Sequence, residues 1–176
     1  MNAPITALNT KMLTRLQVED FIYREAEFLD KWALDDWFAL WAAECSYIIG
    51  PTGKADAREL SPATSLFLVT DDRFRLEQRI IRLKKPTAHA EYPHSRTRHL
   101  YTNVRITEDD GKSVNAIVNF STYRSARSII ANYFGSIDYT FESLGSGDGR
   151  TFKIAHKRIT LDLDSLVPFG KVTILL

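Results

Sequence analysis

The chain has 176 residues, of which 44% are hydrophobic and 26% are charged, and its net charge is only +1. These values predict one globular domain over residues 1–176, with residues 1–13 as a flexible or partner-contacting arm. A nucleic-acid binder normally carries a basic excess, so the charge balance argues against that class. One cysteine, Cys45, excludes an intrachain disulfide and indicates a reducing compartment. Because no signal-peptide pattern and no apolar run of membrane-spanning length is visible, we expect a cytoplasmic protein.

The first part of the chain has helical periodicity. Thr14 and Gln17 have the spacing of a capping box, which predicts a helix start at this point. A stripe of apolar residues then follows at helical spacing: Val18, Ile22, Ala26 and Leu29. We expect a second, short helix that begins at Asp35 or Asp36, carries the aromatic residues up to Trp41 and has Cys45 near its end.

The polar segment 51–62 contains two prolines and a glycine and is predicted to be a loop. A third helix is predicted from Asp71 or Asp72 to Leu83, with Leu76 and Ile80 on its buried side. Lys84-Lys85-Pro86 should end this helix, because cations suit a helix C-terminus and proline cannot continue it.

From Leu100 onward the hydrophobic period changes to two, which is typical of half-buried strands. Strands are predicted over residues 102–107, 114–121 and 129–141, and Asp110-Gly111 predicts a hairpin between the first two. In the last strand the apolar parity changes between Ile154 and Ile159, which predicts a bulge within residues 155–158. Helices followed by strands indicate an α+β fold, in which a curved antiparallel sheet is covered on one face by the N-terminal helices.

A curved sheet can enclose a cavity, so the histidines are the first candidates for chemistry. His89, His94 and His99 are five residues apart, with Glu91 among them, but strand residues five apart point to opposite faces. This spacing disfavours a two-histidine, one-carboxylate iron site. A Rieske cluster needs two cysteines and two histidines, so one cysteine excludes it from this chain.

Two other functions are compatible with the residues alone. His156 beside the bulge, together with an aspartate or one of the tyrosines of the strands, could face the cavity and make the chain a stand-alone lyase or isomerase. Alternatively, the chain could be a ligand-binding scaffold domain that performs no chemistry. Nothing in the spacing of these side chains selects a catalytic pair.

Several ordered segments resemble one known family, the small (beta) subunit of Rieske-type aromatic ring-hydroxylating dioxygenases. The similarity runs from about Val18 to the C-terminus. Its most characteristic part is residues 93–100 with Asn103-Val104; residues 25–30, 34–37, 71–83, 123–125, 158–162 and 172–176 also match. One departure is Ser136, which follows Gly135 where the family has a basic residue.

The resemblance implies a cone-like fold shared with ketosteroid isomerase and scytalone dehydratase. It also implies that a larger alpha subunit carries the Rieske [2Fe-2S] cluster and a mononuclear iron, usually in an α3β3 hexamer. That complex inserts O₂ into an aromatic ring with electrons from NAD(P)H, delivered by a reductase or ferredoxin. This chain would then hold no catalytic residue, cofactor or metal and act structurally. Subunit contacts are expected at Asp72, Arg73, Arg79, Arg96, Arg98, His99 and Asn103.

Overall fold

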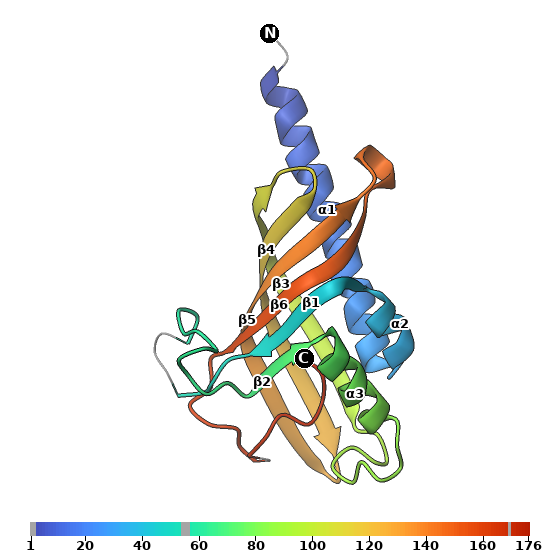
Figure 1. Cartoon of the computed structure of the whole chain (residues 1–176), viewed down its shortest axis with the longest axis vertical. Helices are drawn as coiled ribbons and strands as arrows, with labels where there is room; N and C mark the ends of the chain where they lie inside the picture. The colour runs from blue at the N-terminus through green and yellow to red at the C-terminus, as the bar shows by residue number, and fades with distance from the viewer. Residues whose placement is uncertain (1–2, 54–56, 169) are drawn as a thin grey trace.

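The computed structural model describes residues 3–53, 57–168 and 170–176. The first half of the chain contains all three α-helices and two strands, and the second half contains four longer strands (Figure 1). In chain order the elements are α1 (Ala3–Asp30), α2 (Leu34–Ala39), β1 (Trp41–Ile49), β2 (Val69–Asp72), α3 (Arg73–Leu83), β3 (Arg96–Asp109), β4 (Ser113–Ala126), β5 (Ile129–Leu144), a short 3-10 turn (Gly147–Gly149) and β6 (Thr151–Leu161).

The six strands form one curved, open sheet in the order β2-β1-β6-β5-β4-β3. Neighbouring strands are antiparallel except β1 and β6, which run parallel. The helices lie on one side of this sheet: α1 packs mainly along β3, and α3 packs on β1 and β2 (Figure 1). The predicted α+β fold with a curved sheet is therefore confirmed, with one parallel pair added to the antiparallel pattern.

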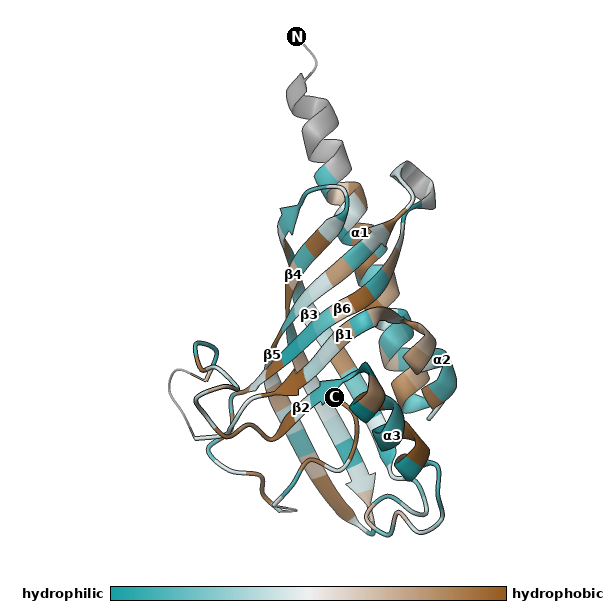
Figure 2. Ribbon diagram, viewed as in Figure 1, coloured by the Kyte–Doolittle hydropathy of each residue, from teal (hydrophilic) through white to brown (hydrophobic). Residues whose placement is uncertain are grey.

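The core lies between the helices and the facing side of the sheet. Hydrophobic and hydrophilic bands alternate along the strands (Figure 2), and the inward positions of β4 and β5 include Val118, Ile137 and Phe141, none of which is exposed. The predicted hairpin is confirmed at Gly111, which has a φ of +86°. The Asp110 carboxylate accepts hydrogen bonds from two backbone amides of this turn and so fixes its shape.

The predicted bulge in β6 is also confirmed. Thr140 of β5 is paired with His156, and the next residue, Phe141, is paired with Ile154, so Ala155 has no partner on β5. This extra residue changes which positions face the core. Ile154 and Lys157 both point inward, although an uninterrupted strand would place them on opposite faces.

Two predictions about the first helices are wrong. The helix α1 begins at Ala3, far before Thr14, and the Thr14 hydroxyl donates to the Asp109 carboxylate of the β3–β4 hairpin instead of capping a helix. The helix α2 begins at Leu34 without a side-chain cap, so Asp35 and Asp36 lie in its first turn.

The predicted extent of that second helix is wrong as well, because Trp41 and Cys45 lie in β1. Pairing with β2 and β6 determines the backbone here. By contrast, α3 spans Arg73–Leu83, and the Asp72 carboxylate accepts a hydrogen bond from the Arg75 amide (2.8 Å), as expected for a helix cap. The described residues of the segment 51–62 contain neither helix nor strand, as predicted.

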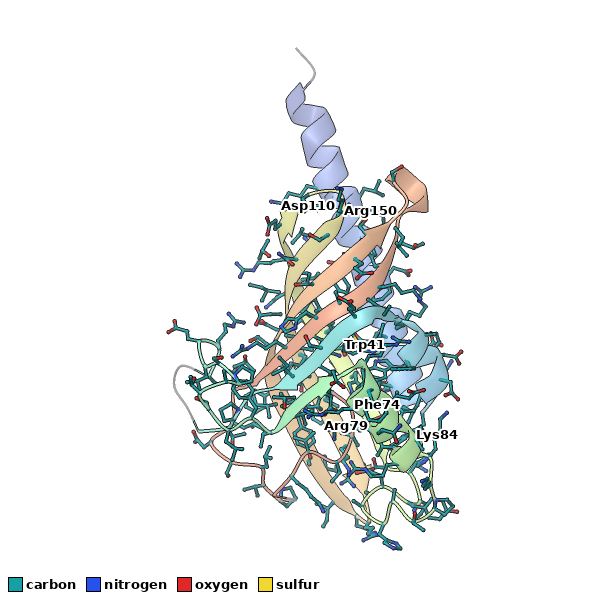
Figure 3. The ribbon with its side chains drawn as sticks, viewed as in Figure 1. Trp41, Phe74, Arg79, Lys84, Asp110 and Arg150 are labelled. Carbon is teal, nitrogen blue, oxygen red and sulfur yellow. The ribbon has the colours of Figure 1, made fainter. Side chains whose placement is uncertain are left out.

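The N-terminal turns of α1 extend past the sheet (Figure 1). Where the helix meets the sheet, Arg150 donates to both carboxylate oxygens of Asp109, each at 2.7 Å, and lies beside the hairpin that contains Asp110 (Figure 3). This ion pair and Thr14 join α1, the β3–β4 hairpin and the start of β6. Within the described residues, no helix is both long and apolar enough to cross a membrane.

Candidate functional site: a filled interior and an exposed sheet face

The interior of the curved sheet contains a buried ion pair. Lys157 of β6 donates from Nζ to Oε1 of Glu25 on α1 at 2.8 Å, and neither residue has any solvent exposure. The same Glu25 carboxylate accepts from Trp37 Nε1 (3.0 Å) and from the Tyr139 hydroxyl (2.7 Å). Three donors therefore satisfy the carboxylate, which is the condition for keeping such a charge away from water.

Burial changes the proton affinities of this cluster. It lowers the pKa of the Lys157 ammonium, an effect that the neighbouring Glu25 carboxylate opposes. Burial also raises the pKa of Tyr139 well above its ordinary value, and Glu25 raises it further because a negative charge disfavours a phenolate nearby. Tyr139 therefore stays a neutral hydrogen-bond donor over the physiological pH range.

The last residues of the chain help to fill the same interior. Ile174, Leu175 and Leu176 are buried, and the Leu176 amide donates to the hydroxyl of Tyr47 at 3.0 Å. Because Glu25 and Lys157 expose no surface and are bound to each other, a substrate cannot contact them in this arrangement. The interior holds acid and base groups, but they serve packing and charge compensation.

Sequence reasoning missed this ion pair, although two signals were present. Lys157 has the same parity as Ile159 and Leu161, so a bulge at residue 155 places it on the buried face. Glu25 follows Ile22 by three residues and lies on the same apolar stripe of α1.

The three clustered histidines lie in separate environments. His99 is buried, with Nδ1 2.7 Å from the Asp30 carboxylate and Nε2 3.1 Å from the Leu175 carbonyl oxygen. His94 stacks on Trp32 at a ring-centroid distance of 4.1 Å, and His89 is exposed. Across residues 3–53, 57–168 and 170–176, no group of three His, Cys, Asp or Glu side chains is placed to hold a metal ion.

His156 does not face the interior, because the bulge directs Lys157 there. Its Nδ1 contacts the Ser46 hydroxyl on the other face of the sheet, and the ring is half-buried. Burial lowers the pKa of His156, and the positive charge of Arg158 lowers it further. The cavity-facing catalytic histidine of the lyase hypothesis is therefore not observed.

Four of the seven expected contact residues are hydrogen-bonded within the chain. Arg73 donates to the carbonyl oxygens of Trp41 and Ala42, at 3.2 and 2.7 Å. Arg79 donates to Asp71 at 2.6 Å and lies between α3 and the sheet (Figure 3). The other two are Asp72, the cap of α3, and His99, bound to Asp30. These side chains hold α3 and β3 in place.

Arg96, Arg98 and Asn103 are exposed on the edge strand β3. Arg98 lies 3.6 Å from Asp30, yet its side chain remains 71% exposed. Asn103 has a φ of +54°, which interrupts the alternation of β3 at this point. The three residues are thus available for contacts that the chain itself does not make.

Large apolar side chains lie beside these arginines on the outer face of the sheet. Leu100, Tyr123, Ile130 and Phe134 are between 41% and 69% exposed. Strand register places Leu100, Ser121 and Phe134 in one cross-strand row, and Arg98, Tyr123 and Asn132 in the next. We call these exposed residues, Arg96, Arg98, Leu100, Tyr123, Ile130 and Phe134, the outer patch. Aromatic and arginine side chains together are typical of protein interfaces.

Comparisons with known proteins agree with the fold and the motifs. Residues 24–167 match the family described as ring hydroxylating beta subunit. The chain is 44% identical over 164 residues to the small oxygenase component of the p-cumate 2,3-dioxygenase system of Pseudomonas putida, covering 93% of this chain and 88% of that protein.

Solved structures show the same architecture. The beta subunit of benzoate 1,2-dioxygenase from Burkholderia mallei superposes with a TM-score of 0.67 at 27% identity, over 88% of this chain and 95% of that one. A protein of Novosphingobium aromaticivorans provisionally assigned as a scytalone dehydratase has a TM-score of 0.62 at 13% identity, over 94% and 99% of the two chains, which shows a shared fold alone. The chain therefore belongs to the ring-hydroxylating beta-subunit family and is a structural, accessory subunit of a multicomponent aromatic-ring dioxygenase.

Proposed function

We propose that this chain is assembled with a larger alpha subunit as an α3β3 hexamer in the cytoplasm. The alpha subunit carries the Rieske [2Fe-2S] cluster and the mononuclear iron, and a ferredoxin or reductase supplies its electrons. The match to the beta-subunit family over residues 24–167 carries this proposal. The complex adds O₂ to an aromatic ring, while this chain supplies the contacts that hold the alpha subunits in place.

The filled interior supports a structural role. An enzyme of the same fold needs a cavity in which acid and base groups reach a substrate. Here Glu25 and Lys157 are fully buried, and Leu176 packs in the same region. The chemistry therefore belongs to the partner, and the stand-alone lyase and the ligand-binding scaffold are not favoured.

We assign the direct subunit contacts to the outer patch together with Asn103. Obligate interfaces bury roughly 2,000 Å² or more and are rich in aromatic and arginine side chains. Arg96, Arg98 and Asn103 supply exposed polar groups beside the apolar part of the patch. Asp72, Arg73, Arg79 and His99 contribute indirectly, by positioning α3 and β3.

The N-terminal segment 1–13 is a second candidate contact. Its described part belongs to α1, which extends past the sheet (Figure 1). Met12 is 64% exposed and Leu16, one turn later, is 59% exposed. A helix that exposes two large apolar side chains one turn apart is suited to packing against a partner.

Co-purification tests the proposal directly. A tagged copy of this chain, expressed with the large subunit from the same operon or genome neighbourhood, should bring down that subunit in equal amount. The eluate should be brown and contain iron and acid-labile sulfide, all of it assigned to the large chain after the two are separated. A colourless eluate that contains this chain alone, at micromolar concentrations of both chains, would contradict the proposal.

The interface assignment has its own test. Arg98→Ala should weaken assembly about 5- to 30-fold, the equivalent of roughly 1–2 kcal/mol for an interface arginine. Arg82→Ala is the matched control, because Arg82 is also an exposed arginine and lies on α3, away from the outer patch. If both variants assemble like the unmodified chain, Arg98 does not contribute a direct contact.

A further inference from the structure

A polar pocket of about 620 Å³ adjoins the outer patch. Its floor is one cross-strand row, in which Asn119 of β4 is paired with Ser136 of β5, and Ser136 is paired with Thr160 of β6. The chain segments that include Gly53 and Arg58 form one wall, and residues 161–164 form the other. The next row of the sheet holds Leu100 and Phe134, so the pocket and the outer patch form one continuous surface.

The floor of the pocket contains a buried hydroxyl without a partner. Thr160 is only 8% exposed, and its Oγ1 makes no hydrogen bond within the described part of the chain. A buried hydroxyl that is not hydrogen-bonded costs roughly 1–3 kcal/mol, so such atoms are normally satisfied. Because Thr160 lines the pocket, a ligand there can complete its hydrogen bonding.

The charge of the pocket favours a cation. Its one arginine, Arg58, donates to the Ser136 hydroxyl at 2.6 Å and lies 3.5 Å from the Asp138 carboxylate, so this positive charge is already compensated. Asp162 and Asp164 also line the pocket, and neither carboxylate has an ion pair or hydrogen bond among the residues described. The two carboxylates and the Thr160 hydroxyl, which line the same pocket, together favour a cationic group with several hydrogen-bond donors.

The chain itself carries such groups, exposed on the same face of the sheet. Arg96 and Arg105 of β3 are exposed and make no ion pair within residues 3–53, 57–168 and 170–176, and Arg98 remains largely exposed beside Asp30. An arginine fits better than a lysine, because the planar guanidinium can donate to a carboxylate with two parallel hydrogen bonds and still reach a third acceptor. Basic β3 and the acidic pocket are therefore complementary between copies.

We propose that this pocket receives a guanidinium group from β3 of a second copy of this chain, Arg96 or Arg98, bound by Asp162, Asp164 and the Thr160 hydroxyl. The proposal rests on the proposed function, since it identifies which surfaces of neighbouring beta subunits meet in the hexamer. The contact is heterologous: one copy supplies the arginine and the next supplies the pocket, and three such contacts form a ring when each rotates the next copy by one third of a turn.

Charge reversal tests this pairing in the complete complex with the large subunit. Asp162→Arg with Asp164→Arg should reduce the mass of the complex from three αβ pairs to one, and so should Arg96→Glu with Arg98→Glu. The chain that carries all four substitutions should recover the mass of three pairs, because its acidic β3 then meets the basic pocket of the next copy. Co-purification of the large subunit with the Asp162→Arg, Asp164→Arg variant shows that the proposed function holds independently of this inference, because neither aspartate belongs to the outer patch.

Two results would overturn the proposal. One is a complex of unchanged mass, at all dilutions, in the Asp162→Arg, Asp164→Arg variant. The other is a fall in the mass of the complex in both double variants that is not reversed in the variant carrying all four substitutions. Thermal unfolding of each isolated chain controls for folding, and a variant that unfolds early is replaced by Asp162→Asn with Asp164→Asn.

A milder substitution probes the hydroxyl at the pocket floor. Thr160→Val keeps the shape of the side chain and removes Oγ1, so association of the αβ pairs should weaken about fivefold, as for one lost hydrogen bond of about 1 kcal/mol. The isolated chain should keep or gain stability, because its own unsatisfied atom is gone. Equal dissociation of the unmodified and Thr160→Val complexes on dilution would contradict a guanidinium bound at Thr160.

Discussion

Replacing Lys157 with methionine should strongly destabilise the fold. The substitution keeps most of the side-chain volume but removes the ammonium group that lies 2.8 Å from Glu25. The carboxylate would keep two donors, from Trp37 and Tyr139, yet it would stay fully buried without a counter-charge. Breaking a buried ion pair on one side costs roughly 3–5 kcal/mol. For a domain of this size, that corresponds to a fall in the unfolding midpoint of about 6–20 °C.

The double variant Glu25→Gln with Lys157→Met separates the charge effect from the hydrogen bonding, because the glutamine carbonyl oxygen can still accept from Trp37 and Tyr139. Replacing both charges with neutral groups of similar size removes the cost of desolvating two ions. We therefore expect the double variant to be more stable than Lys157→Met alone, as measured by thermal and urea unfolding of the isolated chain. The ion pair does not have the role described if the free energy of unfolding of Lys157→Met is within about 1 kcal/mol of that of the unmodified chain. The same conclusion follows if the double variant is less stable than Lys157→Met alone.

Three further variants test the sheet and the pH dependence. Gly135→Ala should lower the free energy of unfolding in urea by about 2–3 kcal/mol, because the new Cβ would lie 2.0 Å from the Thr160 carbonyl oxygen of β6 at a φ of +153°. Gly149→Ala is the control and should be nearly neutral, because no atom lies within 4 Å of its Cβ. Equal effects of the two substitutions would refute this reasoning. Arg150 lowers the pKa of Asp109 to about 2. The stabilisation by the Asp109–Arg150 ion pair is therefore complete above about pH 4 and is lost as the pH falls through 2. Circular dichroism recorded during an acid titration should show a smaller loss in Asp109→Asn. Burial lowers the pKa of His156, so below about pH 6.5 the unfolded chain binds more protons at this residue than the folded chain. The free energy of unfolding should therefore decline as the pH falls below this value. An equal decline in a His156→Gln variant would contradict the assignment to His156.

Local signals in the sequence were sufficient for several elements. The helix α3 is defined by its cap at Asp72 and by the residues after Leu83, and both signals lie within or beside the helix. The hairpin at Gly111 and the bulge at Ala155 likewise follow from short patterns. Such patterns predict correctly because the interactions that stabilise these elements connect residues close in sequence.

The elements that failed depend on distant partners. Trp41 continues the aromatic spacing of α2, and Cys45 is predicted near the end of that helix. Both lie in β1 instead, because Ser46–Ile49 pair with β6 more than a hundred residues later. Thr14 has the spacing of a capping residue, yet its partner is Asp109. Periodicity within a window cannot reveal which distant strand or hairpin will be adjacent.

For the candidate site too, residues close together in the sequence were easier to single out than residues that meet only in the fold. The resemblance to the family predicts subunit contacts at Arg96, Arg98 and Asn103; these residues are exposed on β3, and their place in an interface stays a prediction. The interior ion pair was not predicted, because Glu25 and Lys157 lie 132 positions apart and each alone suggests a solvated surface residue. Only the packing of α1 against the sheet brings them together.

The most direct test of the structural-subunit account is the native mass of the oxygenase purified through this chain, combined with iron analysis of the separated subunits. We predict a complex of three large and three small chains, with all iron on the large chain. A small chain that is isolated alone and converts a substrate without any partner would contradict it.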